Sequence, residues 1–131
     1  MEILQPPGWP RPRGYANGVA ATGRFVFVSG MIGWNADGQF ESDDFAAQAR
    51  QALLNVVAVL READARPGHI VRMTWYVVDK REYLAAGATL GAAYREIVGA
   101  HYPAMTAVEV RALIEDRARV EIEVTAVVPE N

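Results

Sequence analysis

The sequence predicts an α+β domain in which two strands, a helix, a strand, a second helix and two further strands follow one another (ββαβαββ). Two observations predict this class. Some segments are rich in β-branched and aromatic residues, as strands are. They alternate with two segments in which apolar residues recur at helical spacing. The chain of 131 residues suits one domain, and its 51% hydrophobic and 22% charged residues are typical of a folded protein.

Residues 1–14 are predicted to form an extended, proline-rich arm, followed by a single domain over residues 15–131. Prolines at positions 6, 7, 10 and 12 interrupt any apolar run, so neither a signal peptide nor a membrane span is expected in the arm. Residues 15–22 and 24–30 are predicted as the first two strands. The short connection at Gly23 suits an antiparallel hairpin between them.

The first helix is expected to begin after Asp43 or Asp44, because either side chain is a suitable N-cap. Helical spacing then holds for the apolar residues Phe45, Ala49, Ala52, Leu53, Val56, Val57 and Leu60. Pro67 cannot continue a helix, so the helix ends before residues 65–68 and a strand follows over residues 70–78.

A second helix is expected over about residues 81–100, although Gly87 and Gly91 lower its helical propensity. Pro103 breaks this helix, and residues 106–112 and 119–128 are predicted as the last two strands. Apolar and polar residues alternate along the final strand, which predicts one buried and one polar face.

Two of the other strands are apolar on both faces, at residues 25–28 and 75–78. Two helices can cover only one face of a sheet, so something else must cover the opposite face. A second copy of the same sheet would do so most simply, which predicts an oligomer in which the subunit interface is part of the core.

Composition narrows the classes of function. The chain has no cysteine, which excludes disulfides, thiolate zinc sites and a cysteine nucleophile, and a cytoplasmic location is expected. The net charge of −3 and the pI of about 5.4 argue against nucleic acid as a principal partner. His69 and His101 have no further histidine at ligand spacing, so no metal site is expected. His69 is expected at the surface, and His101 is expected to bond carbonyls at a helix end.

Several short motifs in a fixed order carry a resemblance to a known family. They are Gly14-Tyr15, Val28-Ser29-Gly30, Gln48 and Asn55 in the first helix, Pro103-Ala104, and Val120-Glu121-Ile122-Glu123. From residue 15 to 128 the chain resembles the RidA/YjgF family. The resemblance implies a chorismate-mutase-like fold of the bacillus type, with two helices on one face of a mixed sheet. It also implies a homotrimer around a central barrel, with small-molecule clefts between subunits.

The resemblance further implies hydrolysis of reactive enamines and imines, such as 2-aminoacrylate, to a ketoacid and ammonia, without a cofactor. Glu121 matches the glutamate that positions the attacking water, and we expect it to act as a general base. Residues expected to line the cleft are Tyr15, Ser29, Gly30, Met31, Trp34, Gly91, Tyr94, Met105 and Ala107. Glu123 is expected to have a structural role instead, paired with an arginine such as Arg119 or Arg111.

Met105 stands where such members have an arginine that binds the substrate carboxylate. A thioether offers no charge and no strong donor, so 2-aminoacrylate is not the expected substrate. Arg72, Arg111 and Arg119 are the nearby strand cations, but solvated charges are the stronger interpretation of all three.

The preferred hypothesis is hydrolysis of a different, more apolar or larger imine. One alternative is a non-catalytic protein that binds a metabolite or acts as a chaperone. Another is a pathway-specific deaminase of the 2-aminomuconate deaminase kind.

Overall fold

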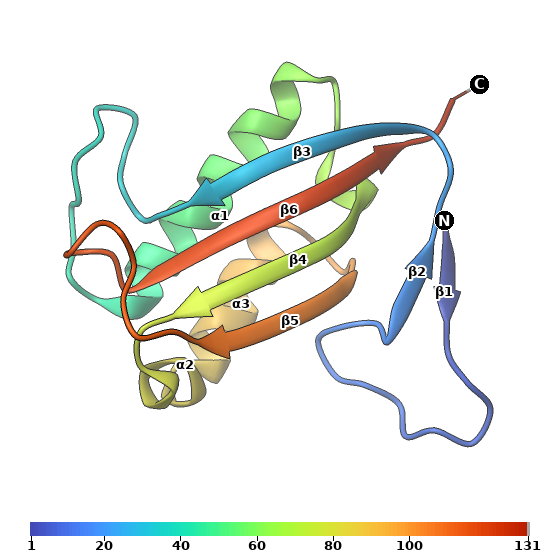
Figure 1. The fold of residues 1–131 in the computed structure, drawn as a ribbon, viewed down its shortest axis with the longest axis horizontal. Coiled ribbons are helices and arrows are strands. Elements are labelled where there is room, and N and C mark those ends of the chain that lie inside the picture. The colour runs from blue at the N-terminus through green and yellow to red at the C-terminus, as the bar shows by residue number, and fades with distance from the viewer. Residues whose placement is uncertain (131) are drawn as a thin grey trace.

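A four-stranded mixed sheet organises the chain, and the computed structural model describes residues 1–130 (Figure 1). Its strands are β3 (Arg24–Met31), β4 (Ile70–Val77), β5 (Ala104–Glu109) and β6 (Val120–Val128), in the order β3-β6-β4-β5. β6 pairs antiparallel with both β3 and β4, whereas β4 and β5 are parallel. The sheet is therefore mixed, as the sequence predicts.

All helices pack on one face of this sheet (Figure 1). They are α1 (Phe45–Glu62), α2 (Lys80–Ala85) and α3 (Gly87–Ile97), and a short 3₁₀ turn, η1 (Pro67–His69), precedes β4. Asp44 is the N-cap of α1, because its carboxylate accepts a hydrogen bond from the Ala47 amide at 2.9 Å. No helix within residues 1–130 is long and apolar enough to cross a membrane.

The core lies between α1 and the sheet. Leu53 and Leu60 of α1 pack against β6, whose alternating residues Val120, Ile122, Val124 and Ala126 are at most 3% exposed. The predicted two-faced final strand is confirmed, because a period of two places every second side chain toward the helices.

Gln48 is a buried polar residue that joins the start of α1 to the segment before β6. Its amide nitrogen donates to the carbonyls of Ser42 and Arg117, both at 3.0 Å. Its amide oxygen accepts from the Arg119 amide at 2.8 Å. The side chain is 1% exposed, so these three bonds replace the water that the backbone groups would otherwise need.

The predicted hairpin between residues 15–22 and 24–30 is wrong. β2 (Gly18–Ala20) pairs antiparallel with β1 (Glu2–Leu4) in a separate two-stranded ribbon, and β3 pairs only with β6. The alternating pattern identified strand character but not the partner, because several strands offer an edge with the same period. The N-terminal arm therefore contains a strand, which turns the first residues back along β2 (Figure 1).

The single helix predicted over about residues 81–100 is two helices. α2 ends at Ala85, α3 begins at Gly87, and α3 ends at Ile97 before Gly99, whose φ is +94°. The break is at Ala86, whose ψ of 8° is not helical, and the next residue, Gly87, has low helical propensity. This bend places Tyr83 of α2 and Leu90 of α3 over the same part of the sheet.

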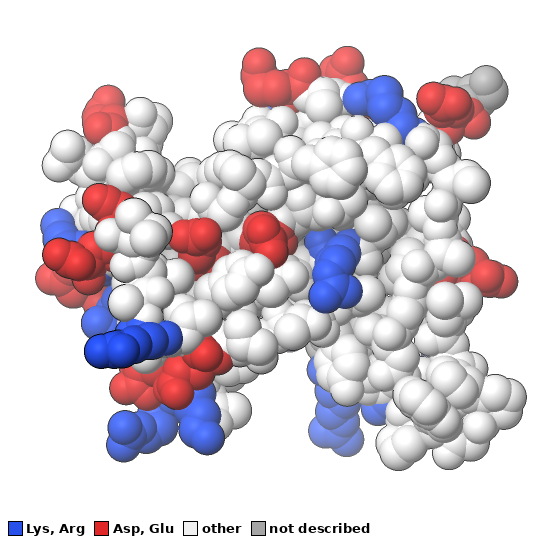
Figure 2. All heavy atoms as spheres, viewed as in Figure 1, with Lys and Arg blue, Asp and Glu red and all other residues white. Residues whose placement is uncertain are grey.

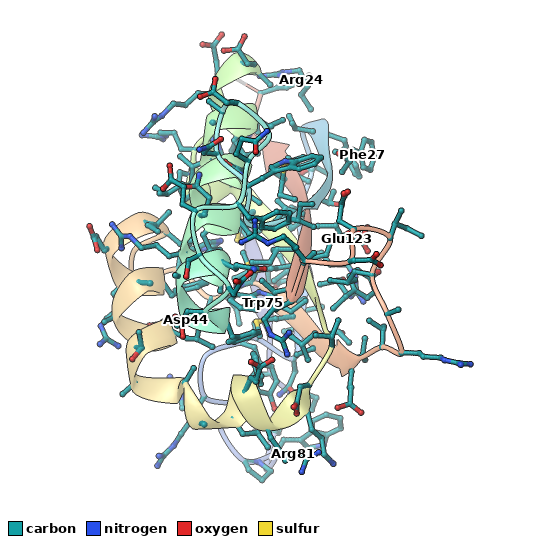
Figure 3. The ribbon with its side chains drawn as sticks, turned by 90° about the vertical axis from the view of Figure 1, so that its left-hand side faces the viewer. Arg24, Phe27, Asp44, Trp75, Arg81 and Glu123 are labelled. Atoms are coloured by element: carbon teal, nitrogen blue, oxygen red, sulfur yellow. The ribbon has the colours of Figure 1, made fainter. Side chains whose placement is uncertain are left out.

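The opposite face of the sheet is uncovered in the single chain. Phe25 and Phe27 of β3 are 56% and 74% exposed, and their rings lie 6.0 Å apart. Figure 2 views the molecule on this side, and Figure 3 shows Phe27 and Glu123 projecting from the sheet away from the helices. Two neighbouring exposed phenylalanines on a strand are typical of a surface that another protein covers.

Candidate functional site

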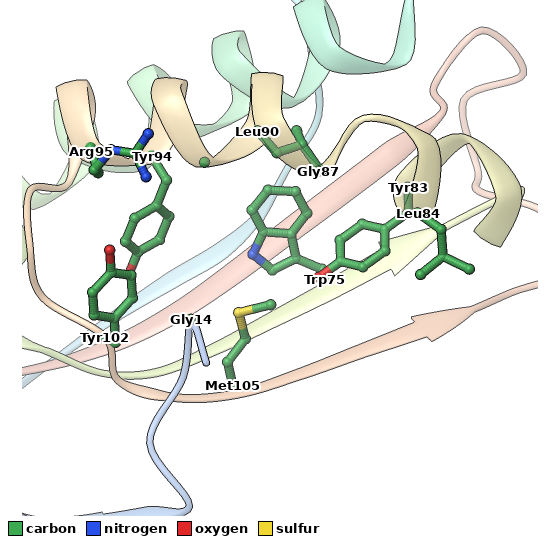
Figure 4. Close-up of a pocket in the computed structure, with 11 residues that line it drawn as sticks. Gly14, Trp75, Tyr83, Leu84, Gly87, Leu90, Tyr94, Arg95, Tyr102 and Met105 are labelled. Atoms are coloured by element: carbon green, nitrogen blue, oxygen red, sulfur yellow. The ribbon is translucent and has the colours of Figure 1, made fainter. Parts of the chain in front are cut away.

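A cavity with a mostly apolar lining lies between the sheet and the helices α2 and α3 (Figure 4). We call it the helix-side pocket, and its volume is about 390 Å³. Its lining residues are Gly14, Trp75, Tyr83, Leu84, Gly87, Leu90, Gly91, Tyr94, Arg95, Tyr102 and Met105. A cavity of this size, with mostly aromatic and aliphatic walls, is typical of a small-molecule site.

Aromatic rings form most of the pocket wall. Trp75 meets Tyr83 edge-on with ring centroids 5.9 Å apart, and Tyr94 stacks on Tyr102 at 5.4 Å with an interplanar angle of 8°. The Tyr94 hydroxyl donates to the His101 carbonyl at 2.5 Å, and burial raises the pKa of Tyr94. The tyrosine is therefore a neutral, fixed part of the wall at physiological pH.

Met105 lies on β5 with its side chain in the helix-side pocket (Figure 4). It is directly opposite Met73 of β4 in the parallel register, and Met73 is fully buried. This part of the pocket wall is therefore an uncharged thioether beside other apolar side chains.

Glu121 and Glu123 lie on the other face of the sheet, which we call the open face. In the strand register, Glu121 is opposite Tyr76 of β4, and Glu123 is opposite Thr74. The Glu121 carboxylate lies so close to Gly30 that a Cβ at that glycine would come within 2.1 Å of its oxygen. Any side chain at position 30 would therefore displace the Glu121 carboxylate.

The open face also has a shallow groove of about 350 Å³. Its lining includes Phe27, Ser29, Arg72 and Glu123. Glu123 accepts a hydrogen bond from the Tyr76 hydroxyl at 2.5 Å, which raises the pKa of that tyrosine. Glu121 has neither a hydrogen bond nor a salt bridge to a side chain within residues 1–130. Of the two glutamates, Glu121 is thus the one free to bind water or a ligand.

The structure brings the predicted cleft residues together in two separate groups. Gly91, Tyr94 and Met105 line the helix-side pocket. Gly30 lies beside Glu121, and Ser29 lines the groove on the open face. Residues of the two groups are on opposite faces of one sheet, so a single chain cannot bring Met105 and Glu121 to one ligand.

Four further predicted residues lie outside both groups. Tyr15 lines a neighbouring pocket with Tyr102 and residues of the arm. Ala107 pairs with Trp75 in the register of β5 and β4. Trp34 packs near Phe40 with ring centroids 6.2 Å apart, and Met31 contacts the hydrophobic core.

Two predicted roles of polar residues are corrected by the structure. Glu123 pairs with Tyr76 instead of an arginine, and Arg119 forms its salt bridge with Glu82 at 2.6 Å. α2 carries Glu82 to this position, which sequence spacing does not reveal. His101 does contact a backbone carbonyl, but it is that of Ile70 at the start of β4, at 2.7 Å.

His69 is half-buried and not fully on the surface, and its Nδ1 accepts from the Arg66 amide at 3.0 Å. No group of three or more potential metal-ligating side chains occurs within the described residues 1–130.

Two important residues of the helix-side pocket were not predicted. Trp75 is 3% exposed, and its Nε1 is the one buried side-chain nitrogen or oxygen without a hydrogen-bond partner in residues 1–130. Arg95 is the one charged residue in the lining. Arg95 follows Gly91 by four positions, so both lie on one face of α3, and this spacing is the signal that could have identified it.

Comparisons with known proteins agree with this architecture. The sequence profile of the family described as Endoribonuclease L-PSP matches residues 10–128. The 2-iminobutanoate/2-iminopropanoate deaminase of Escherichia coli K12 is 38% identical over 113 residues, which cover 86% of each protein.

Solved structures of similar proteins share the fold of this chain. The Rid family protein YyfB from Yersinia pestis has a TM-score of 0.83 and 33% identity, and the match covers 97% of this chain and 98% of that one. The YjgF gene product of E. coli has a TM-score of 0.71 and 35% identity, with coverage of 97% and 98%. These proteins have the chorismate-mutase-like fold, so the predicted α+β class is confirmed. Both the profile match and the shared fold extend over nearly all of the sequence, and the chain belongs to the Rid/YjgF family.

Proposed function

We propose that this protein hydrolyses a reactive enamine or imine to a carbonyl compound and ammonia, in clefts between the subunits of a homotrimer. The observation that carries the proposal is the free Glu121 carboxylate beside Gly30 on an uncovered sheet face. A relative named 2-iminobutanoate/2-iminopropanoate deaminase, at 38% identity, supports the reaction class.

In the proposed reaction, Glu121 accepts a proton from a water molecule as the water oxygen bonds to the imine carbon. The proton then passes to the imine nitrogen, which gives a tetrahedral carbinolamine. Glu121 next moves the hydroxyl proton of this intermediate to the same nitrogen, and the C–N bond breaks to release ammonia. The carbon keeps the water oxygen as a carbonyl group. Ser29 and nearby backbone N–H groups would hold a polar end of the substrate.

In a trimer, residues of the helix-side pocket and residues of the open face would meet in one cleft. Glu121 and Met105 are on opposite faces of one sheet, so a cleft containing both needs the open face of one subunit beside the helix-side pocket of another. The exposed Phe25 and Phe27 would then be covered. Burying apolar surface stabilises an assembly by about 25 cal/mol per Å² removed from water.

Placing a charge on the open face tests this assembly. We expect Phe27→Glu to lower the molar mass in solution from that of a trimer toward that of a single chain, because desolvating a carboxylate opposes association. Light scattering after size-exclusion chromatography measures the mass. Val59→Glu on the outer surface of α1 is the matched control and should leave the mass unchanged. A wild-type chain that is monomeric at micromolar concentration would contradict the proposed cleft.

Met105 is expected to determine which imine is hydrolysed. We expect Met105→Arg to raise kcat/KM for 2-aminoacrylate at least about tenfold, because a guanidinium binds a carboxylate in a bidentate manner. Ammonia release from freshly generated 2-aminoacrylate is the measurement. Met105→Leu is the control for volume without charge and should give no gain. A folded Met105→Arg protein without any gain would show that Met105 does not limit turnover of this substrate.

A further inference from the structure

The buried indole of Trp75 is an unsatisfied donor at the wall of the helix-side pocket. Its side chain is 3% exposed, and within residues 1–130 its Nε1 has no partner. Burying an N–H group without an acceptor is unfavourable, and native proteins rarely leave one unpaired. Figure 4 shows the indole nitrogen turned toward the space between Tyr94, Gly14 and Met105. The atom has almost no accessible surface in the single chain, so a ligand oxygen would satisfy this donor once the neighbouring pocket side chains move aside.

The helix wall of the pocket lacks side chains at two positions. Gly87 and Gly91 are four residues apart on α3, so the same face of the helix presents backbone instead of side chains. A Cβ at Gly87 would meet no atom within 4 Å, and one at Gly91 would meet only Arg95 Nη1 at 3.4 Å. The space along the helix is therefore open, and the rings of Trp75 and Tyr83 border it.

Arg95 supplies a positive charge to the same pocket. It is exposed, it is the one charged residue in the lining, and it forms no salt bridge within residues 1–130. A guanidinium without a carboxylate partner can bind the carboxylate of a ligand. Met105 on the strand side of the pocket carries no charge, whereas Arg95 places a cation on the helix side.

We propose that the helix-side pocket binds an aromatic 2-oxo or 2-imino carboxylate. Its ring would lie among Met105, Leu90 and Tyr83, its carboxylate would pair with Arg95, and one of its oxygens would accept from Trp75 Nε1. This inference rests on the proposed function, since it names the substrate class of the same cleft. Its test is a binding measurement, which needs no turnover.

Phenylpyruvate is a stable probe of this ligand class, and 2-oxobutanoate is its small aliphatic counterpart. In calorimetric titrations of the wild-type protein we expect phenylpyruvate to bind at least about tenfold more tightly, since its ring buries apolar surface that the smaller acid lacks. Arg95→Gln should weaken phenylpyruvate binding about tenfold. Arg61→Gln, on α1 and in none of the described pockets, is the control and should leave the affinity unchanged.

The hydrogen bond to Trp75 is tested directly by NMR of the ¹⁵N-labelled wild-type protein. The indole N–H signal of Trp75, assigned by its absence from Trp75→Phe, should move downfield when phenylpyruvate is added. The signals of Trp9 and Trp34 serve as internal references. An unchanged Trp75 signal at saturating phenylpyruvate, or equal affinity for both acids, would overturn the proposed substrate class.

The two proposals fail in distinguishable ways. If phenylpyruvate binds through Arg95 but no imine releases ammonia, the site assignment stands and the proposed hydrolysis is wrong. If small aliphatic imines are hydrolysed but phenylpyruvate does not bind, the hydrolysis stands and the aromatic substrate class is wrong.

Discussion

Replacing Glu121 with glutamine is expected to lower the rate of imine hydrolysis about 100- to 10,000-fold, the usual contribution of a general base. An amide keeps the size of the side chain and its place beside Gly30, but it cannot accept the proton of water. Ammonia release from a panel of freshly generated imines, including those of aromatic 2-oxo acids, measures the effect on kcat.

Glu123→Gln is the matched control for this experiment. Glu123 shares the open face with Glu121, but it already accepts the hydrogen bond of Tyr76. We therefore expect its loss to change the rate far less. Full activity of Glu121→Gln, or a larger loss in Glu123→Gln, would show that Glu121 is not the base. Phenylpyruvate binding should survive in Glu121→Gln, because Arg95 and Trp75, and not Glu121, make its proposed polar contacts.

Replacing Gln48 with leucine is expected to lower the free energy of unfolding by roughly 3 kcal/mol or more. The substitution leaves the carbonyls of Ser42 and Arg117 and the amide of Arg119 without their side-chain partner. The three hydrogen bonds are part-buried, and losing each one costs about 1 kcal/mol. Chemical denaturation at one fixed protein concentration measures the change, since association would otherwise shift the midpoint.

Gln39→Leu is the control for this stability measurement. Gln39 is exposed, and only its backbone, not its side chain, hydrogen-bonds within residues 1–130. Its substitution should change the free energy of unfolding by less than about 0.5 kcal/mol. An equal effect of the two substitutions would mean that the three bonds of Gln48 do not stabilise the fold.

The strongly periodic segments could be predicted from the sequence, and the partners of short strands could not. α1 has an N-cap and a regular apolar stripe, so its extent follows from local rules. β2 has three residues, and nothing in them distinguishes β1 from β3 as a partner. The long predicted helix is divided at Ala86, just before Gly87, because tertiary packing decides whether a helix of weak propensity continues or breaks.

Candidate site residues divide in the same way. Glu121 and Met105 stand out because the motifs around them resemble a known family. Trp75 and Arg95 belong to no motif, and their importance depends on what surrounds them in space. An unpaired indole nitrogen is visible only when every neighbouring acceptor can be located.

The sequence by itself determined the α+β class, the buried face of β6 and the absence of a charged side chain at position 105, since each depends on residue type and local period. Only the tertiary structure decided which strands pair, that Met105 and Glu121 lie on opposite faces of the sheet, and that α3 brings Arg95 to the pocket beside Trp75. Local preferences act over a few neighbouring residues, whereas pairing and pocket formation depend on contacts between segments far apart in the chain.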